Sequence, residues 1–255
     1  MAQMAERAPV WTTEALERNP HADAEKARKV QAMFAAIARS YDLNNRLHSF
    51  FQDQRWRRAV VRAAGVDRQS QVLDVACGTG DLAEAFADAG ATVTGVDFTP
   101  EMLEVARHKA ATSAERTPVT YLRGDAMDLS FPDASFDVVS IAFGIRNVAD
   151  PARALREFRR VLRPGGRLVV LEFAEPANPV ARWASNLYTR RIMPWTASLV
   201  ARDTSGAYHY LPRSVSTFQD PAAFAAGLRT AGFDDRSSRP LSMGICVLHR
   251  AVRPT

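Results

Sequence analysis

The sequence predicts an α/β fold with a doubly wound, mostly parallel seven-stranded sheet and an antiparallel C-terminal hairpin strand. From residue 71 onward, short apolar runs alternate with helix-length amphipathic segments, which is the rhythm of repeated strand–helix–strand units. Glycine or aspartate follows several of these runs, where the chain turns at the end of a strand. The last two apolar runs have no helix between them, which is typical of a hairpin.

Composition is that of an ordinary globular protein, with 255 residues, 47% hydrophobic and 24% charged. Cys77 and Cys246 lie too far apart in sequence to suggest a metal site, so we expect no metal and two reduced thiols. No apolar run reaches the roughly 18 residues of a membrane span, and the N-terminus lacks a signal peptide. These features predict a cytoplasmic protein.

Two segments precede the alternating pattern. Residues 1–23 are polar and aperiodic, which predicts a flexible tail. Residues 24–70 are expected to form a helical cap that closes at Gly65. Its first helix shows apolar residues at helical spacing, namely Val30, Met33, Phe34 and Ile37.

Residues 71–255 are expected to form the main domain. The predicted strands are 71–75, 92–96, 119–123, 136–142 and 167–173, followed by a hairpin around 233–236 and 244–249. The predicted helices are 81–89, one that begins at Pro100 after a Thr99 cap, 151–162 and 221–231. A mostly helical insertion interrupts this order at 177–212.

The stretch VLDVACGTG, residues 72–80, places a glycine loop after a strand. The residues from Gly78 to Ala83 fit the dinucleotide pattern G-x-G-x-x-A, so a nicotinamide-dependent oxidoreductase is one interpretation. Asp74 and Asp81 flank the loop and would repel a pyrophosphate. A ligand that carries positive charge and no phosphate resolves this conflict, and S-adenosylmethionine has both an ammonium and a sulfonium group.

Two more acids follow successive strands. Asp97 stands where an acid accepts ribose hydroxyls, and Asp125 could accept the amino hydrogens of adenine. Phe98 or Met102 could pack on the adenine ring. Each acid alone also fits an ordinary loop position. Together they fit a ligand site, because ligands of open α/β sheets bind at the carboxyl ends of strands.

The stretches VLDVACGTGDLA, GVDFTPEML, LRGDAMDLSFPDASFDVV and RVLRPGGRLVVLEF resemble successive motifs of class I methyltransferases over residues 71–173. The resemblance implies that S-adenosylmethionine is the methyl donor. The implied cofactor-binding residues are Asp74, Ala76, Gly78, Thr79, Gly80, Asp97, Phe98, Met102, Asp125, Ala126 and Ala142.

Outside this core, AFGIRNVADPARALREFRRVLRPGG, ARSYDLNNRLHSFFQDQRWRR, AYHYLPRS and MGICVLHRA resemble the ubiquinone/menaquinone biosynthesis C-methyltransferase family. That resemblance spans about residues 30–250 and implies methylation of a ring carbon of a polyprenylated quinol. Demethylmenaquinol is the expected acceptor; a 2-polyprenyl-6-methoxy-1,4-benzoquinol, or another small molecule, is the alternative. The chain departs from the family pattern at Asn44, Asp53, Ala142, Arg163 and Ala174.

Three residues are the implied catalytic candidates. A quinol carbon becomes a good nucleophile when the phenol ionises, and Arg146 is a permanent cation that favours the phenolate. Asn147 could orient a quinol oxygen or a water, and Tyr41 could close over the ring. A structural ion pair is the alternative for Arg146, and a core aromatic is the alternative for Tyr41.

A polyprenyl acceptor implies contact with a membrane surface, on the inner face of the cytoplasmic membrane. Aromatic and basic residues interleave in ARWASNLYTRRIMPWTASLVAR, which favours an interfacial helix. A lid, or a helix that packs on a second copy in a homodimer, fits the same pattern. The net charge of +5 also suggests nucleic-acid binding as an interpretation. However, the residues AFGI after the fourth strand do not form a base-flipping motif, so we expect no nucleic-acid partner.

Overall fold

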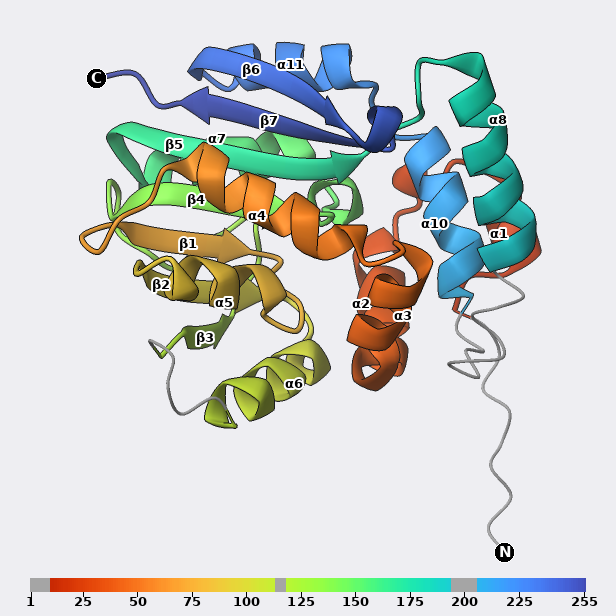
Figure 1. The fold of residues 1–255 in the computed structure, drawn as a ribbon, viewed down its shortest axis with the longest axis horizontal. Helices are drawn as coiled ribbons and strands as arrows, with labels where there is room; N and C mark the ends of the chain where they lie inside the picture. Colours follow the sequence, from red (N-terminus) through yellow and green to blue (C-terminus); the bar gives the residue numbers. More distant parts are fainter. Residues whose placement is uncertain (1–9, 113–117, 194–205) are drawn as a thin grey trace, which may run out of the picture.

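The computed structural model describes residues 10–112, 118–193 and 206–255, and its centre is a seven-stranded sheet (Figure 1). The strand order is β3-β2-β1-β4-β5-β7-β6, with parallel pairing from β3 through β5 and antiparallel pairing of β7 with β5 and β6. This confirms the predicted fold class. The strands are β1 (Gln71–Val75), β2 (Thr92–Asp97), β3 (Thr120–Arg123), β4 (Phe136–Ala142), β5 (Leu162–Phe173), β6 (Asp234–Leu241) and β7 (Cys246–Val252).

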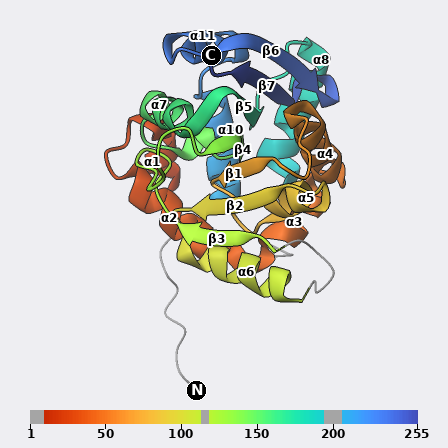
Figure 2. The same ribbon diagram turned by 90° about the vertical axis from the view of Figure 1, so that its left-hand side faces the viewer.

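Helices cover both faces of the sheet because successive strand residues point to opposite sides. One core joins Val72, Val138 and Val169 to α4 (Gln52–Ala64), α5 (Asp81–Asp88) and α6 (Pro100–Ala111). The other joins the neighbouring residues Leu73 and Val139 to α7 (Pro151–Val161) and α11 (Pro221–Thr230). Figure 2 shows α4 and α5 on one side of the sheet and α7 on the other.

A group of helices lies beyond the carboxyl ends of the parallel strands, on the right in Figure 1. It has its own buried cluster, which includes Trp11, Met33 and Tyr210. These helices and turns are α1 (Thr13–Glu17), η1 (Pro20–Ala22), α2 (Lys26–Ile37), η2 (Ala38–Ser40), α3 (Tyr41–His48), α8 (Pro179–Leu187), the π-helical turn η4 (Tyr188–Ile192) and α10 (Ala207–Ser216).

The prediction of a flexible tail over residues 1–23 is wrong from residue 10 onward. Trp11 is 2% exposed, and its ring stacks on Tyr210 with centroids 4.7 Å apart. Thr12 caps α1 by accepting a hydrogen bond from the Ala15 N–H. No periodicity marks this segment, because three separate buried residues, Trp11, Leu16 and Pro20, attach it to the rest of the protein in place of an apolar stripe.

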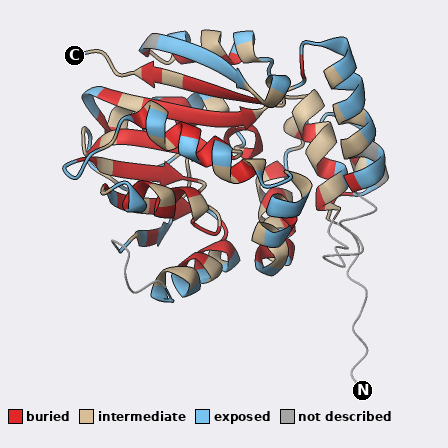
Figure 3. Cartoon of the chain, viewed as in Figure 1, coloured by how far each residue is buried: buried red, intermediate tan, exposed pale blue. Residues whose placement is uncertain are grey.

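The expected boundary between cap and main domain also needs correction. Helix α4 falls within the predicted cap of residues 24–70, yet Trp56 and Val60 belong to the core on the sheet. Figure 3 shows several buried residues on α4 where it crosses the sheet, and this helix contacts β5, β4 and β7. The cap that stands apart from the sheet therefore ends near α3. Thr99 does precede α6 as predicted, but its side chain makes no capping hydrogen bond.

Gly80 stands at the start of α5 for a packing reason. Its φ of +88° is a left-handed conformation that side chains disfavour. A Cβ at this position would lie 2.2 Å from the Tyr121 hydroxyl. The Tyr121 side chain of β3 therefore accounts for the glycine at this position, and the role of Gly80 in cofactor binding stays a prediction.

We expect Gly80→Ala to lower the free energy of unfolding by about 2–4 kcal/mol, because it adds both backbone strain and a clash. Gly165→Ala is the matched control, since Gly165 has a φ of +77° and a Cβ there would meet no atom within 4 Å. This control should cost only about 1 kcal/mol. Urea unfolding measures both; equal losses would contradict the clash, and Tyr121→Phe should restore part of the Gly80→Ala loss.

Candidate active site

Two adjoining cavities lie where the parallel strands meet the N-terminal helices. The smaller cavity has a volume of about 120 Å³ and lies over the ends of β1, β2 and β4. The larger cavity has a volume of about 480 Å³ and lies among α3, α4, α8 and α10. Phe34, Tyr41 and Phe143 line both cavities, so these three side chains form a shared wall.

Most of the predicted cofactor residues come together around the smaller cavity. They lie at or just after the ends of four different strands, β1 to β4, so residues far apart in sequence meet at one edge of the sheet. Its lining includes Ala76, Gly78, Asp97, Phe98, Met102, Asp125, Ala126 and Ala142, together with the catalytic candidates Tyr41 and Asn147.

The charge of the smaller cavity is negative. Asp97 and Asp125 line it, and its described lining residues include no lysine, arginine or histidine. Asp97 accepts hydrogen bonds from the Gly78 and Thr99 N–H groups, each at 2.8 Å. Burial raises the pKa of Asp97 above its ordinary value despite these bonds. Asp125 Oδ1 accepts a hydrogen bond from the Met127 N–H at 2.9 Å, which fixes the orientation of that carboxylate in the cavity lining.

These residues fit S-adenosylmethionine and do not fit a dinucleotide. A Cβ built on Gly78 would meet only the Tyr41 ring, at 4.0 Å, so this glycine leaves the backbone open toward the cavity. A pyrophosphate at this loop would face two acids with no basic lining residue to balance it among the described ones. A cationic ligand with ribose hydroxyls would instead face the carboxylates of Asp97 and Asp125, which attract positive charge and accept hydrogen bonds.

Asp74 does not line the smaller cavity, in contrast to the sequence interpretation. It is 1% exposed, and its Oδ1 accepts a hydrogen bond of 2.6 Å from Ser140 Oγ on β4. Its Oδ2 has no hydrogen-bond partner of standard geometry within the described chain. Burial raises the pKa of Asp74 to about 7. The carboxyl therefore lies buried beneath the glycine loop, bonded to β4 rather than facing the cavity.

Thr79 likewise lies outside the lining of the cavity. Its hydroxyl donates a 2.5 Å hydrogen bond to Asp42 Oδ1 of α3. Lys109 of α6 donates to the other oxygen of Asp42 at 2.8 Å and also pairs with Asp81. Asp42 thus joins the cap to the glycine loop, immediately beside Tyr41.

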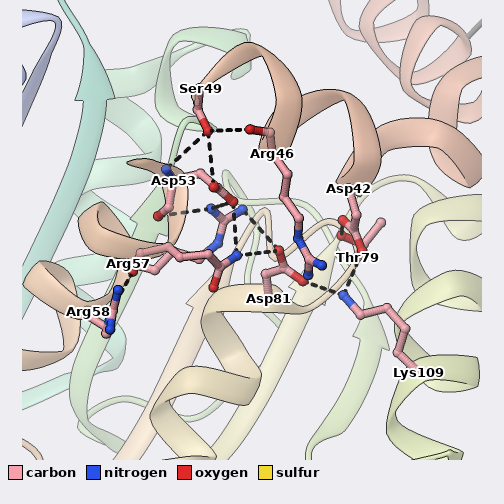
Figure 4. Close-up of polar contacts among 10 residues, drawn as sticks. Asp42, Arg46, Ser49, Asp53, Arg57, Arg58, Thr79, Asp81 and Lys109 are labelled. Atoms are coloured by element: carbon pink, nitrogen blue, oxygen red, sulfur yellow. Dashed lines mark hydrogen bonds and ion pairs between the residues drawn. The ribbon is translucent and has the colours of Figure 1, made fainter. Parts of the chain in front are cut away.

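This contact is part of a larger network, shown in Figure 4. Arg57 lies 3.7 Å from Asp81 and 3.3 Å from Asp53, and Ser49 donates to Asp53 at 3.1 Å. Burial opposes ionisation of Asp81, but Arg57 and Lys109 outweigh it and hold the pKa of this carboxyl below its ordinary value. The network ties α3 and α4 to α5 and α6 through ion pairs and hydrogen bonds.

The larger cavity is mainly aromatic and apolar. The rings of Phe143 and Phe173 stack with centroids 4.4 Å apart, and Trp56 contacts both edge-on. Phe143 has a φ of +58°, a strained value for a side chain of this size, which is frequent at functional sites. The strained backbone turns this ring toward the boundary between the two cavities.

Arg146 lines the larger cavity and is held there in an ion pair with Glu172, as one of the two sequence interpretations expected; its electrostatic role stays a prediction. Its Nη1 donates to Glu172 Oε1 at 2.5 Å and to the Phe143 carbonyl at 2.8 Å. Its guanidinium carbon lies 5.3 Å from the centre of the Phe173 ring. These contacts fix the orientation of the cation at the cavity wall.

The structure places Asn147 and Tyr41 near the junction of the two cavities. Asn147 lines the smaller cavity, where its amide donates to the Phe143 carbonyl and accepts from the Tyr210 hydroxyl at 2.9 Å. Tyr41 stands in the shared wall, and burial raises the pKa of its hydroxyl. Both side chains therefore shape the junction of the cavities.

Several site residues escaped sequence reasoning. Glu172 fixes Arg146, and Asp42 and Lys109 join the cap to the loop, but these partners lie 26 and 67 positions apart. A carboxylate inside the apolar run RLVVLEF was the one available signal for Glu172. Asp42 and Lys109 stand on helix faces where charged residues usually face solvent, so no local signal marks them.

Comparisons with known proteins agree with this geometry. The model of the ubiE/COQ5 methyltransferase family matches residues 22–253. A demethylmenaquinone methyltransferase of Thermus thermophilus is 46% identical over 224 residues, covering 87% of this chain and 100% of that protein. The ubiquinone/menaquinone biosynthesis C-methyltransferase UbiE of Geobacter sp. strain M21 is 39% identical over 232 residues, covering 90% of this chain and 98% of that protein.

A solved structure shares the fold at much lower identity. Phosphoethanolamine N-methyltransferase 2 of Haemonchus contortus, in complex with S-adenosyl-L-methionine, superposes with a TM-score of 0.59 at 17% identity. The match covers 79% of this chain and 53% of that one. At this identity the likeness shows the fold alone.

The raised pKa of Asp74 predicts how stability changes with pH. The unfolded carboxyl ionises near its ordinary value of 3.8, whereas the folded one stays neutral until about pH 7. Stability is therefore lost as the pH rises through this window. Asp74→Asn does not titrate, so its stability relative to the wild type should increase by on the order of 3 kcal/mol from pH 4.5 to 7.5. Parallel urea-unfolding curves at each pH for the two proteins would contradict this assignment.

Proposed function

The chain belongs to the ubiE/COQ5 methyltransferase family, and on that premise we propose that it transfers a methyl group from S-adenosylmethionine to a ring carbon of a polyprenylated quinol in menaquinone synthesis. The observation that carries the proposal is the pair of adjoining cavities. One is small and lined by acids, the other is large and aromatic, and Phe34, Tyr41 and Phe143 separate them. A donor and an apolar acceptor held in these cavities meet at one wall.

Bound S-adenosylmethionine supplies an electrophilic methyl group on a sulfonium. The chain supplies an acidic environment for that ligand: Asp97 and Asp125 at the cavity surface, and Asp74 beneath the glycine loop. Asp97 is already oriented by two backbone N–H groups, so its remaining acceptor capacity is available for ribose hydroxyls. The acids hold the donor in one orientation before the acceptor arrives.

Arg146 is the proposed electrostatic group for the acceptor. A quinol hydroxyl resembles a phenol, with a pKa near 10, and a fixed cation beside it favours the phenolate that makes the ring carbon nucleophilic. Glu172 and the Phe143 carbonyl keep the guanidinium from turning away. Arg146 Nη1 is used by these partners and Nε donates to Ser214 at 3.4 Å, so the proposal assigns the Nη2 N–H groups to the quinol oxygen.

Tyr41 and Asn147 are proposed to position the reactants. Tyr41 belongs to both cavities, and burial keeps its hydroxyl protonated, so it can donate a hydrogen bond to a quinol oxygen. Asn147 lines the donor cavity and is oriented by its hydrogen bonds with Tyr210 and the Phe143 carbonyl, from where it can orient a quinol oxygen or a water. Their common effect is to exclude water from the junction.

The relatives favour demethylmenaquinol as the acceptor, because four of them, at 41–46% identity, are named demethylmenaquinone methyltransferase. A methoxybenzoquinol remains the alternative acceptor. None of the helices in residues 10–112, 118–193 and 206–255 is long and apolar enough to cross a membrane. A polyprenylated acceptor resides in a bilayer, so we propose that the protein meets it at the membrane surface.

A methyl-transfer assay tests the proposed function. Purified protein, labelled S-adenosylmethionine and detergent-dispersed demethylmenaquinol or 2-polyprenyl-6-methoxy-1,4-benzoquinol are incubated in parallel, and the organic extract is counted. We expect label in the demethylmenaquinol extract at several times the level of the other. No label in either extract, with S-adenosylmethionine binding intact, would contradict the proposal.

Arg146→Lys tests the electrostatic role, because lysine keeps the charge but loses the planar fork that Glu172 holds. Turnover should fall at least tenfold, while the dissociation constant for S-adenosylmethionine changes less than twofold. Arg163→Lys is the matched control, since this partly exposed arginine pairs with Asp137 and lies at the end of β5 opposite to Glu172. Equal turnover of the two variants would rule out the proposed role.

A further inference from the structure

Large apolar side chains are exposed on the segments that border the larger cavity. Between α3 and α4, Phe50 is 67% and Phe51 is 62% exposed. On the turn η5 (Ser242–Gly244), Met243 is 79% exposed. On α8, Val180 and Trp183 are 74% and 67% exposed. We call these five residues the apolar rim.

The three segments of the apolar rim are joined around the cavity. Phe50 contacts the Tyr188 ring, with centroids 5.5 Å apart, which ties the α3–α4 turn to the helix that follows α8. Ser242 accepts a hydrogen bond from Trp56 of α4 and donates one to Gln52 at 2.5 Å, which ties η5 to the same region. Phe50, Met243 and the Ala181 side of α8 all line the larger cavity. The rim therefore borders the opening through which an acceptor would enter.

Two of these segments hold strained backbone in order to present the side chains. Phe50 and Phe51 have φ values of +52° and +59°, and Ser242 and Met243 have values of +47° and +58°. Glycine or asparagine would adopt this conformation at lower cost. The chain instead places phenylalanine and methionine there and leaves them in contact with water, which is unfavourable unless an apolar environment covers them.

The elements that carry or adjoin the rim are rich in positive charge. Helices α3, α4 and α8 and the turn η4 contain eight arginines and two acids. Both acids, Asp42 and Asp53, are engaged in ion pairs with Lys109 and Arg57. Arg55, Arg182 and Arg191 are exposed. Arginines beside apolar side chains complement a surface of anionic headgroups over hydrocarbon.

We propose that the apolar rim inserts into an anionic lipid bilayer and places the opening of the larger cavity against it. This inference rests on the proposed function, because a polyprenyl acceptor gives the protein a reason to meet a bilayer, and it names the surface that does so. Phe50, Phe51 and Met243 enter the interface at the opening, and Trp183 anchors α8 beside it. The acceptor then passes from the membrane into the cavity without crossing water.

Cosedimentation with vesicles of 30% phosphatidylglycerol and 70% phosphatidylcholine tests the surface. The variants are Phe51→Asn, which suits the left-handed backbone, and Trp183→Gln, both at residues that do not line either cavity. Each single variant should weaken vesicle binding at least threefold, and the double variant at least tenfold. Leu122→Gln is the control, because Leu122 is 42% exposed on β3, far along the sheet from the rim; it should bind as the wild type does.

Activity separates this inference from the proposed function. The double variant should methylate a short-tailed, water-soluble demethylmenaquinol analogue at the wild-type rate and lose at least tenfold on acceptor embedded in the vesicles. Unchanged vesicle binding by the double variant would overturn the docking surface. A change from dimer to monomer on sedimentation, with vesicle binding unaltered, would also overturn it and assign the rim to a second copy of the chain. Failure of the wild type on the short-tailed analogue would instead count against the proposed function.

Discussion

The hydrogen bonds of the Asp42 carboxylate are the interaction on which the rest of the site depends. One oxygen accepts from Thr79 in the glycine loop, and the other accepts from Lys109 of α6. The neighbouring residue, Tyr41, is thereby held in the wall between the two cavities. Other hydrogen bonds also join the cap to the strand ends, from Gln31 to the Phe98 carbonyl at 3.0 Å and from Lys26 to the Val148 carbonyl at 2.7 Å. The Asp42 carboxylate differs from these contacts because it bonds to the glycine loop itself.

The two cavities follow from that attachment. The strand ends supply the acids of the smaller cavity, as the doubly wound fold requires. The cap closes it from above and provides one side of the larger cavity, whose other side is the Phe143–Phe173 stack and the Arg146–Glu172 pair. A fold common to many methyltransferases thus acquires a second cavity through helices outside the sheet, because residues of the cap and the insertion supply a large part of the lining of the larger cavity.

Much of the fold could be predicted because its signals are local. The apolar runs at 71–75 and 136–142 coincide with β1 and β4, and Asp97 and Asp125 lie at strand ends that converge on one cavity. The roles of Gly80 and Asp74 could not be read, since they depend on Tyr121 and Ser140 from other strands. The burial of Trp11 against Tyr210 escaped prediction for the same reason: the partners lie about 200 positions apart and share no sequence pattern.

A double-mutant cycle between Asp42 and Lys109 tests the central claim most directly. The dissociation constant of S-adenosylmethionine is measured by calorimetry for the wild type, Asp42→Asn, Lys109→Met and the double variant, with Lys29→Met as a control for loss of another cap ion pair. If the attachment holds the cap over the donor, each single variant weakens binding about fivefold or more and the coupling energy is about 1 kcal/mol. Additive effects, or binding unchanged by either substitution, would show that the cap is positioned by other contacts.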